Sequence, residues 1–362
     1  MSLRNTSISG TMPDSGNPVI SVLMCVYNTK EEWLCKAIES ILNQSYTNFE
    51  FIIVLDCPTD NSEQIVESYA ERDGRIVVLK NDKNIGLTKS LNKGLAAVRG
   101  MYIARMDADD VSLPNRLEMQ YRYMEANPGT VVAGARVFTP GLNQAVIYEW
   151  TGDQQALKIR LLFHNYGVPH PTAFIRRSVL TDHEITYTEW VKKSQDYKLW
   201  VDLLPYGDII MLPDILLMYR VHENQITANP TSQRGFAHRV ALEQAEALLG
   251  EMSEQEQLIH CWFDDPKHIE GGRKGYKAYI RRMIEANAEK GIYDQQKLVR
   301  ELSFMWCQKA WRRAVLMHKF DFFMDPKTLV MLKPSMARYI RQNKKAKADY
   351  LEEIRKAQAA WE

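Results

Sequence analysis

The sequence predicts an α/β protein with a doubly wound, mostly parallel sheet, followed by an α-helical module. Two observations predict this fold. Short apolar runs rich in β-branched residues alternate with segments whose apolar residues recur at helical spacing, which is typical of sheets whose strands are joined by helices. Beyond residue 230 the strand-like runs stop, and Ala, Glu, Lys, Arg and Gln dominate at helical spacing. We therefore expect a flexible segment 1–17, an α/β domain 18–235 and a helical C-terminal module 236–362.

The first half of the chain shows the alternation most clearly. Apolar runs predict buried strands at 19–26, 49–55, 76–80, 101–106 and 131–138. Helical spacing predicts helices at 31–42, 62–72, 88–98 and 114–127. Because the intervening loops are short, each helix would return the chain to the same edge of the sheet and make neighbouring strands parallel.

The order is less regular after residue 139. The pattern predicts helices at 157–163 and 194–204, and strands at 172–175, 209–212 and 215–220. Two prolines predict an extended segment at 169–172, because the residue before a proline avoids helical geometry. Further helices are expected at 236–250, 254–262, 273–290, 294–318 and 335–360.

Composition and charge limit the function classes. The chain has 362 residues, of which 45% are hydrophobic and 25% charged, so it can form a substantial core. Residues 300–362 hold 14 Lys and Arg against 7 Asp and Glu, which leaves the first 299 residues with a net charge of −6. That acidic bulk argues against nucleic-acid binding. Five cysteines without a metal-binding spacing indicate reduced thiols, and no apolar run is long enough to cross a bilayer.

Three carboxylates, Asp107, Asp109 and Asp110, follow the predicted strand 101–106 within four residues. Like charges this close repel one another unless a cation neutralises them. Carboxylate oxygens suit Mg²⁺ and Mn²⁺, which also bridge diphosphate oxygens. The cluster therefore predicts a metal–diphosphate site. The alternative is an acidic turn that caps the helix after Pro114, with Asp110 or Ser112 as N-cap.

Six segments, in order, resemble the family-2 glycosyltransferases over residues 19–228. They are ISVLMCVYN at 20–28, IIVLDCPTDNS at 52–62, NIGL at 84–87, DADDVSLPNRL at 107–117, SQDY at 194–197 and YRVH at 219–222. The resemblance implies the GT-A fold, a Rossmann-like doubly wound sheet, for residues 18–235. It also implies metal-dependent, inverting transfer of a sugar from a nucleotide-sugar.

The resemblance implies roles for individual residues. Asp107 and Asp109 match the DxD motif, in which Asp109 and Asp107 would bind the metal together with His222. Asp196 matches the general base. The nucleotide-sugar would be held by the residues that match the rest of the pocket: Val26, Tyr27, Asn28, Asp56, Gly86, Arg105, Asp107 and Ala108. Two positions depart from the pattern, since Leu55 and Gln195 stand where acids are usual.

A purely structural role remains an alternative for several of these residues. Asp56 can be a turn residue and Tyr27 part of the core. Gly86 can serve a simple turn, and Asp196 can be a first-turn acid that interacts with the helix dipole. Trp190 can stack on a sugar or pack in the core. His222 in a loop is as consistent with no metal role as with one.

We expect the enzyme to use Mn²⁺ or Mg²⁺ and a UDP-sugar as donor. The acceptor would be a saccharide or a lipid-linked saccharide in cell-surface polysaccharide biosynthesis. We expect a cytoplasmic protein, and the basic C-terminal helices suggest peripheral contact with the inner face of the membrane. A catalytically silent nucleotide- or carbohydrate-binding scaffold is the main alternative. A sugar nucleotidyltransferase fits poorly, because no Gly-rich basic loop follows the first strand.

Overall fold

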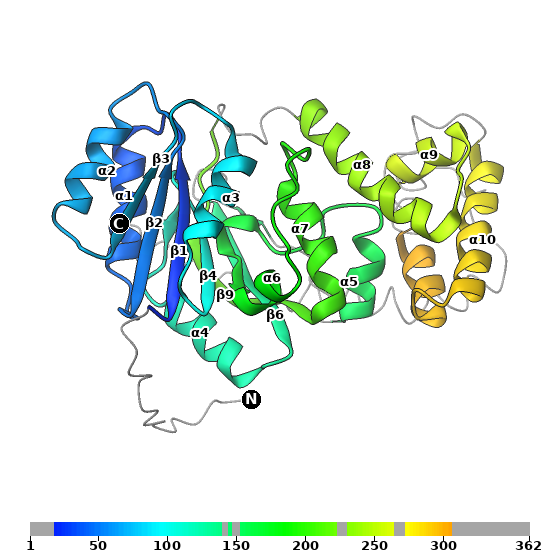
Figure 1. Ribbon diagram of the computed structural model, residues 1–362. Helices are drawn as coiled ribbons and strands as arrows, with labels where there is room; N and C mark the ends of the chain where they lie inside the picture. The colour runs from blue at the N-terminus through cyan, green and yellow to red at the C-terminus, as the bar shows by residue number, and fades with distance from the viewer. Residues whose placement is uncertain (1–17, 140–143, 147–152, 223–229, 264–271, 306–362) are drawn as a thin grey trace.

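The computed structural model describes residues 18–139, 144–146, 153–222, 230–263 and 272–305 (Figure 1). The segment 1–17, expected to be flexible, and the helix expected at 335–360 lie outside these ranges, as does almost all of the basic C-terminal stretch. The helix expected at 294–318 is described up to residue 305 and is helical from 295 onward.

Four parallel strands form the first half of the sheet, as the apolar runs predict. They are β1 (Ile20–Val26), β2 (Phe49–Leu55), β3 (Ile76–Lys80) and β4 (Tyr102–Asp107). Within the described residues they stand in the order β3-β2-β1-β4. All seven residues of β2 are buried, because helices cover both faces of the sheet.

The position of β4 creates the crevice in which ligands of such sheets bind. From β1 the chain runs to β2 and β3 on one side, and then returns to place β4 on the other side of β1. At this reversal the loops after β1 and β4 leave in opposite directions and open a crevice at the carboxyl ends of the strands. Cys25 stands opposite Asp107 in the register, so the segments that follow both residues lie at the same edge.

The second half of the sheet is mixed. Its strands are β5 (Val111–Ser112), β6 (Thr130–Thr139), β7 (Gln144–Val146), β8 (Phe174–Arg176) and β9 (Asp208–Met218). β8 lies between β4 and β6 and runs antiparallel to both, whereas β9 runs parallel to β6. The short strand β5 pairs antiparallel with the end of β9 and was not predicted, because two residues carry no period.

Two local predictions were wrong. The strands expected at 209–212 and 215–220 are one strand, β9, because its register with β6 jumps from Leu212 to Ile215 and Pro213 and Asp214 bulge out. The segment expected to be extended at 169–172 contains the 3-10 turn η2 (His170–Thr172), in which Thr172 N–H donates to the Pro169 carbonyl. Proline is accepted there because the first turn of a helix needs no N–H from it.

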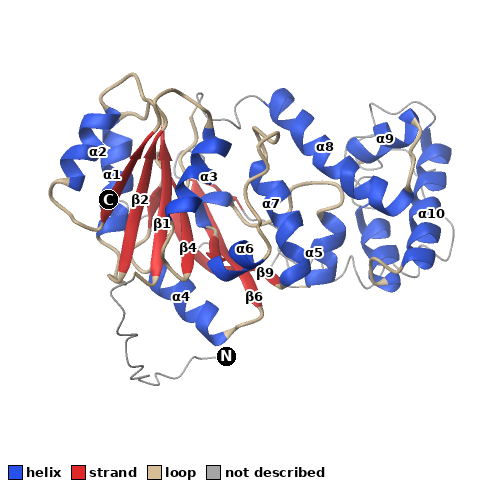
Figure 2. Ribbon diagram, viewed as in Figure 1, coloured by secondary structure: helices blue, strands red, loops and turns tan. Residues whose placement is uncertain are grey.

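Helices flank the sheet on both faces (Figure 2). They are α1 (Glu31–Leu42), α2 (Ser62–Ala70), α3 (Leu87–Ala97), α4 (Arg116–Ala126), α5 (Gln154–Arg160), α6 (Arg177–Asp182) and α7 (Gln195–Leu203), with the 3-10 turn η3 (Leu204–Tyr206) after α7. Alternate residues of β1 enter two different cores: Met24 packs with α1, α2 and α4, and Leu23 packs with α3 and α7. The sheet is therefore doubly wound, as expected.

The helices α8 (Pro230–Leu249), α9 (Glu254–Cys261) and α10 (Gly272–Lys290) follow the sheet and precede the helical segment that begins at residue 295. α8 joins the two parts of the fold, because Val240 and Ala241 pack in the α3–α7 core while Ala245 and Leu248 pack with α9 and α10. None of the described helices is long and apolar enough to cross a membrane. The domain boundary near residue 235 stays a prediction.

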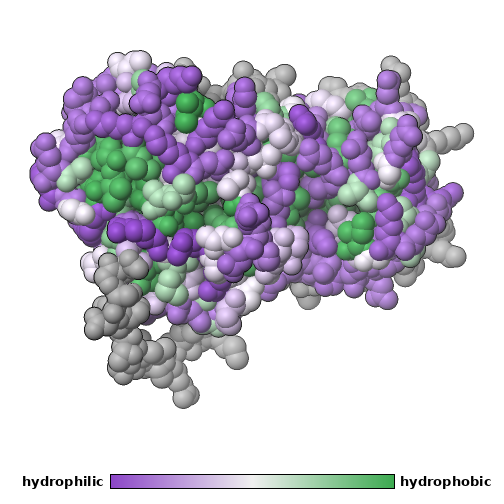
Figure 3. All heavy atoms as spheres, viewed as in Figure 1, coloured by the Kyte–Doolittle hydropathy of each residue, from purple (hydrophilic) through white to green (hydrophobic). Residues whose placement is uncertain are grey.

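The β3 edge is less completely covered than the centre of the sheet. On the face seen in Figure 3, apolar side chains gather over the β1–β3 side of the sheet. Val77 and Leu79 of β3 are only partly buried there, although both pack against the α3–α7 core. The ligand crevice lies instead at the carboxyl ends of the strands, where residues that follow β1, β2 and β4 line it.

Candidate functional site

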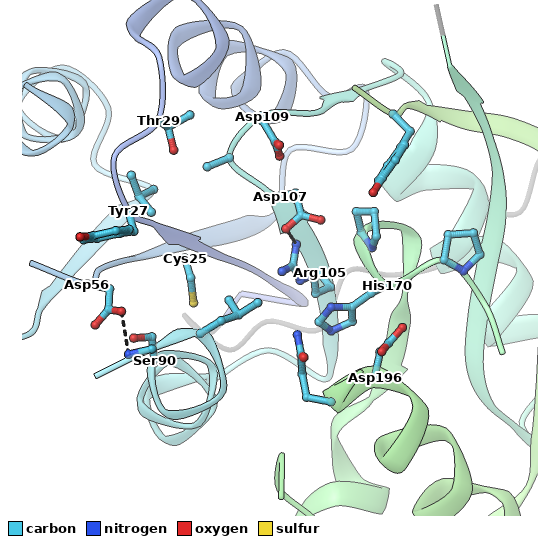
Figure 4. Close-up of a pocket in the computed structure, with 18 of the residues that line it drawn as sticks. Cys25, Tyr27, Thr29, Asp56, Ser90, Arg105, Asp107, Asp109, His170 and Asp196 are labelled. Atoms are coloured by element: carbon cyan, nitrogen blue, oxygen red, sulfur yellow. Dashed lines mark hydrogen bonds and ion pairs between the residues drawn. The ribbon is translucent and has the colours of Figure 1, made fainter. Parts of the chain in front are cut away.

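A cleft of about 660 Å³ opens at the carboxyl ends of β1 and β4. The residues to which the family resemblance assigns a role all line this cleft: Val26, Tyr27, Asn28, Asp56, Gly86, Arg105, Asp107, Ala108, Asp109, Asp196 and His222. In Figure 4, Asp107 and Asp109 lie toward one end of the group and Asp196 toward the other, with Arg105 and His170 between them. The fold thus brings together residues that are up to 196 positions apart in the chain.

The acid cluster lies where β4 ends. One carboxylate oxygen from each of Asp107, Asp109 and Asp110 falls within 4.8 Å of the others. Burial raises the pKa of the Asp107 carboxyl, and burial together with the two neighbouring acids raises that of Asp110 well above its usual range. Three acids held this close store electrostatic repulsion that a bound cation would relieve.

Two buried arginines support the acid cluster. The Arg105 guanidinium forms an ion pair with Asp107. Arg116, on α4, donates from Nη2 to the Arg105 carbonyl at 2.6 Å and from Nε to the Gln120 side chain at 3.0 Å. Their charges offset part of the acid repulsion, so the cluster persists in a folded chain. Arg105 Nε is buried and has no hydrogen-bond partner in the described part of the chain.

The acid cluster meets the requirements of a divalent-cation site. Asp110 is 1% exposed, and its Oδ1 accepts from the Arg220 backbone N–H at 2.8 Å. Its Oδ2 is buried and receives no hydrogen bond from any described residue. A buried carboxylate oxygen with no partner is costly unless a ligand completes it, and hard oxygen donors are those that Mg²⁺ and Mn²⁺ prefer. The alternative interpretation as a helix cap is wrong, because the N-cap of α4 is Asn115.

His222 reaches the cluster through the pairing of β5 with β9. This pairing sets Val111 opposite Met218, so the residues after β9 pass beside Asp109 and Asp110. His222 Nε2 lies 2.8 Å from Asp109 Oδ2, and its ring packs on Trp33 with centroids 4.8 Å apart. The histidine is thus held next to the acid that the sequence analysis assigned to the metal.

The Asp56 carboxylate accepts hydrogen bonds from the segment that leads into α3. Its Oδ1 accepts from the Asn81 side chain at 2.8 Å and from the Ile85 N–H at 2.9 Å, and its Oδ2 accepts from the Gly86 N–H at 2.9 Å. Gly86 has φ 86°, a conformation that a side chain disfavours. Asp56 therefore shapes the loop that lines the cleft, while a carboxylate still has lone-pair sites for one more donor.

The loop after β1 also has a constrained backbone. Asn28 adopts φ 47°, and its side-chain oxygen accepts from the Thr59 N–H at 2.7 Å, which ties this loop to the loop after β2. Tyr27 is 48% exposed, so it is not part of the core. Its ring stands at the wall of the cleft, where Figure 4 shows it above Asp56.

Asp196 stands in the first turn of α7, after Ser194, whose φ is 61°. Burial raises the pKa of its carboxyl, and a hydrogen bond from Asn165 Nδ2 to Oδ2 at 2.7 Å opposes the rise. The neighbouring Gln195 is 5% exposed, and its Oε1 is buried without a hydrogen-bond partner among the described residues. A carboxylate with a raised pKa, in a cleft, is suited to accept a proton.

Sequence reasoning missed several residues of the site. His170 lines the cleft, and its Nε2 lies 2.7 Å from the Tyr187 hydroxyl. Burial, and then the charge of Arg105, lower the pKa of His170 well below its usual range. Asn165 and Arg116 were missed as well. The segment from His170 to Thr172 resembles an acceptor-side strand of the family, and Arg116 lies within the motif at 107–117, but neither pattern gives these two side chains a role. Asn165 lies in none of the six segments.

Comparison with known proteins identifies the family. The sequence pattern of Glycosyl transferase family 2 matches residues 21–183. A glycosyltransferase of Methanocaldococcus jannaschii is 36% identical over 210 residues, which are 56% of this chain and 71% of that protein. The chain belongs to glycosyltransferase family 2. The resemblance drawn from the motifs is thereby confirmed, and the protein is a glycosyltransferase.

Other relatives of this family-2 chain have more specific names. The O-antigen biosynthesis glycosyltransferase WbnJ of Escherichia coli is 34% identical, with 56% of this chain and 80% of WbnJ covered. Crystal structures of S. aureus TarS include one of residues 1–349 with UDP-GlcNAc, which matches with a TM-score of 0.54 at 18% identity, over 83% of this chain and 93% of that one. The expected GT-A fold is confirmed.

Proposed function

We propose that this glycosyltransferase carries out metal-dependent, inverting transfer of a sugar from a nucleotide-sugar to a saccharide or lipid-linked acceptor. We further propose a UDP-sugar as donor and cell-surface polysaccharide biosynthesis as the process. The observation that carries the proposal is the shared cleft of the acid cluster and Asp196. A metal site and a base with a raised pKa are the two groups that such a transfer needs.

The names of relatives support the donor and the process. WfgD of Escherichia coli, 28% identical over 58% of this chain and 80% of its own length, is named a UDP-Glc:α-D-GlcNAc-diphosphoundecaprenol β-1,3-glucosyltransferase. AmsE of Erwinia amylovora, 28% identical, is named for amylovoran biosynthesis. These names favour a UDP-sugar, a lipid-linked acceptor and polysaccharide assembly for this chain too.

In this proposal Asp107, Asp109 and His222 would hold Mn²⁺ or Mg²⁺. When bound, the cation neutralises the negative charge that develops on the leaving diphosphate. Arg105 offers its buried N–H groups on the same side of the cleft and would hold a phosphate oxygen. Ala108, between the two acids, lines the cleft with its backbone and a small side chain, which leaves room for the donor.

The nucleoside lies, in this proposal, against the walls formed by Val26, Tyr27, Asn28, Asp56 and Gly86. The exposed Tyr27 ring provides an apolar face for a base or ribose. Within the described residues Asp56 Oδ2 accepts one hydrogen bond, from the Gly86 N–H, and it can accept another from an N–H of uracil. The Asp56–loop contacts fix the position of that oxygen before any nucleotide binds.

Asp196 is the proposed general base. Its carboxylate removes the proton of the acceptor hydroxyl as that oxygen attacks the anomeric carbon. The bond from the anomeric carbon to the diphosphate oxygen breaks at the same time, and its electron pair leaves with the nucleoside diphosphate. Attack on the face opposite the leaving group inverts the anomeric configuration. Asn165 orients the carboxylate through its 2.7 Å hydrogen bond.

The scaffold alternative is favoured by Leu55 and Gln195, which stand where acids are usual, and by the hydrogen bonds of Asp56 to its own loop. A UDP-release assay with Mn²⁺ and a panel of UDP-sugars separates the two functions. We expect turnover with one sugar that falls about a hundredfold or more in Asp109→Ala and in Asp196→Ala. Asp202→Ala, on the same helix as Asp196 and paired with Lys198, is the matched control and should retain activity. Binding of UDP without turnover of any sugar would favour the scaffold.

The arrangement into domains 18–235 and 236–362 is likewise a proposal. So is a cytoplasmic location with contact at the inner face of the membrane, which rests on the charge of residues 300–362. Co-sedimentation with anionic vesicles, for the full chain and for a chain ending at residue 305, tests the membrane contact. Equal binding by both chains would count against the basic C-terminal stretch as the contact.

A further inference from the structure

An arginine stacked on a tryptophan lies next to the end of the cleft that contains Asp196, the proposed general base. α8 starts there: Gln233 lines the cleft, and the Ser194 hydroxyl donates to the Gln233 carbonyl at 3.5 Å. The next residue, Arg234, is exposed, and its guanidinium carbon lies 4.8 Å from the ring centroid of Trp262 at the end of α9. Figure 1 shows α8 running from beside α7 toward α9.

The tryptophan is held in place from α8. His238, one helical turn after Arg234, meets the Trp262 ring edge to face, with centroids 5.3 Å apart and planes at 72°. Burial, and then the charges of His164 and Arg234, lower the pKa of His238 to about 4, so the ring is neutral near pH 7. His164 and Arg234 are thus close enough to His238 for their charges to act on its pKa. The indole is therefore a fixed platform for the arginine.

This neighbourhood continues into the cleft. His164 directly precedes Asn165, which lines the cleft and hydrogen-bonds to Asp196. Arg234 forms no ion pair with any carboxylate in the described ranges, whereas other exposed basic residues, such as Lys80 and Arg239, are paired with acids. Among the described residues Arg234 is therefore a cation without a counter-ion, and it follows directly after Gln233, which lines the cleft together with Asp196.

The chemistry of this arrangement selects an anionic group with several oxygens. A guanidinium stacked on an indole keeps its N–H edge free and fixed in direction, so little conformational entropy is lost when it binds. That edge matches two oxygens of a phosphate. A phosphate monoester carries more negative charge near pH 7 than a carboxylate, so the same edge binds it more strongly.

We propose that Arg234, supported by Trp262, binds a phosphate group of the acceptor, separately from the donor diphosphate at the acid cluster. The inference rests on the proposed function, because it takes the Asp196 end of the cleft as the acceptor end. It defines the acceptor class as a phosphate-bearing saccharide, such as a sugar joined to a carrier through a diphosphate. Neutral saccharides without a phosphate would bind at this end more weakly.

A binding experiment without donor or metal tests this subsite directly. Phenyl diphosphate is titrated into the full chain in EDTA and followed by ³¹P NMR, because the unneutralised acid cluster repels the probe under these conditions. We expect saturable binding that weakens about tenfold or more in Arg234→Gln, with an intermediate loss in Arg234→Lys, which keeps the charge but not the planar fork.

Arg239→Gln is the matched control, because Arg239 lies on the same helix, stacks on Trp190 at 3.8 Å, and is already paired with Glu243. Binding in this variant should equal that of the wild type. Absence of saturable binding in the wild type, or equal losses in both variants, would overturn the subsite. Binding of glucuronate as tight as that of phenyl diphosphate would overturn the phosphate assignment. Since donor and metal are absent, failure here leaves the donor assignments standing, and these are tested by UDP release.

Discussion

Replacement of Arg116 by Met should destabilise the protein strongly, because this arginine holds the strand that carries the acid cluster. The side chain is 0% exposed and lies between α4 and β4. Burial, and then the charge of Arg105, lower the pKa of Arg116 to about 9, so it is still charged at neutral pH. Its guanidinium donates to the Arg105 carbonyl and to the Gln120 side chain.

The magnitude follows from the groups that lose a partner. Met fills much of the volume but donates no hydrogen bond, so two buried oxygens are left without these donors. Each buried oxygen that loses its donor costs about 1–3 kcal/mol of stability. Removal of a desolvated charge returns part of this free energy, so we expect a net loss of about 2–4 kcal/mol in the free energy of unfolding. The folded fraction should also bind Mn²⁺ more weakly, because the Arg105 backbone leads into Asp107.

Urea unfolding followed by tryptophan fluorescence measures the loss. The matched control is Arg122→Met on the same helix, since Arg122 is exposed and paired only with Glu118 one turn away. That pair should contribute less than about 0.5 kcal/mol. If Arg116→Met unfolded within about 1 kcal/mol of Arg122→Met, our account of how the acid cluster is supported would be refuted.

Three further predictions concern packing and pH. Gly100→Ala should lower the free energy of unfolding in urea by about 1–3 kcal/mol, because its Cβ would meet the Ser21 backbone nitrogen at 2.6 Å. Gly74→Ala, with open space around the Cβ, should not lower it. Asn165→Ala should move the acidic limb of the kcat profile to higher pH, because it removes a hydrogen bond that lowers the pKa of Asp196; an unmoved limb would argue against Asp196 as the base. Burial lowers the pKa of His260 from about 6.5 to about 4. Between these pH values the histidine is protonated in the unfolded chain but not in the folded chain, so the free energy of unfolding should fall as the pH drops from about 6.5 to 4. His260→Phe should show a smaller decline in the urea midpoint over this range, and an unchanged decline would contradict this.

The sequence predicted the first half of the fold closely because its signals are local. The helix expected at 31–42 and the strand expected at 76–80 have the observed bounds, since amphipathic spacing and an apolar run each report burial directly. The mixed second half was harder to predict. The antiparallel course of β8 and the pairing of β5 with β9 depend on contacts between distant segments, which leave no period in the sequence.

In the candidate site, too, local motifs could be recognised in the sequence and contacts between distant segments could not. Asp107, Asp109 and Asp196 could be selected because motifs mark them, and the fold then placed them in one cleft. The residues that hydrogen-bond to these acids or support them could not be selected from the sequence. The bond from Asn165 to Asp196 spans 31 residues, and Arg116 reaches the acids only through packing of α4 on β4. The occupation of Asp56 by the backbone at 85–86 was equally invisible in the sequence.

The most direct test of the central claim is calorimetric titration of UDP into the protein with Mn²⁺ and, separately, with EDTA. If the acid cluster is the metal–diphosphate site, UDP should bind with Mn²⁺, and binding should weaken at least about tenfold in EDTA and in Asp109→Asn. This substitution preserves the shape of the side chain while removing its charge. Equal UDP affinity under all three conditions would contradict the assignment of Asp107 and Asp109.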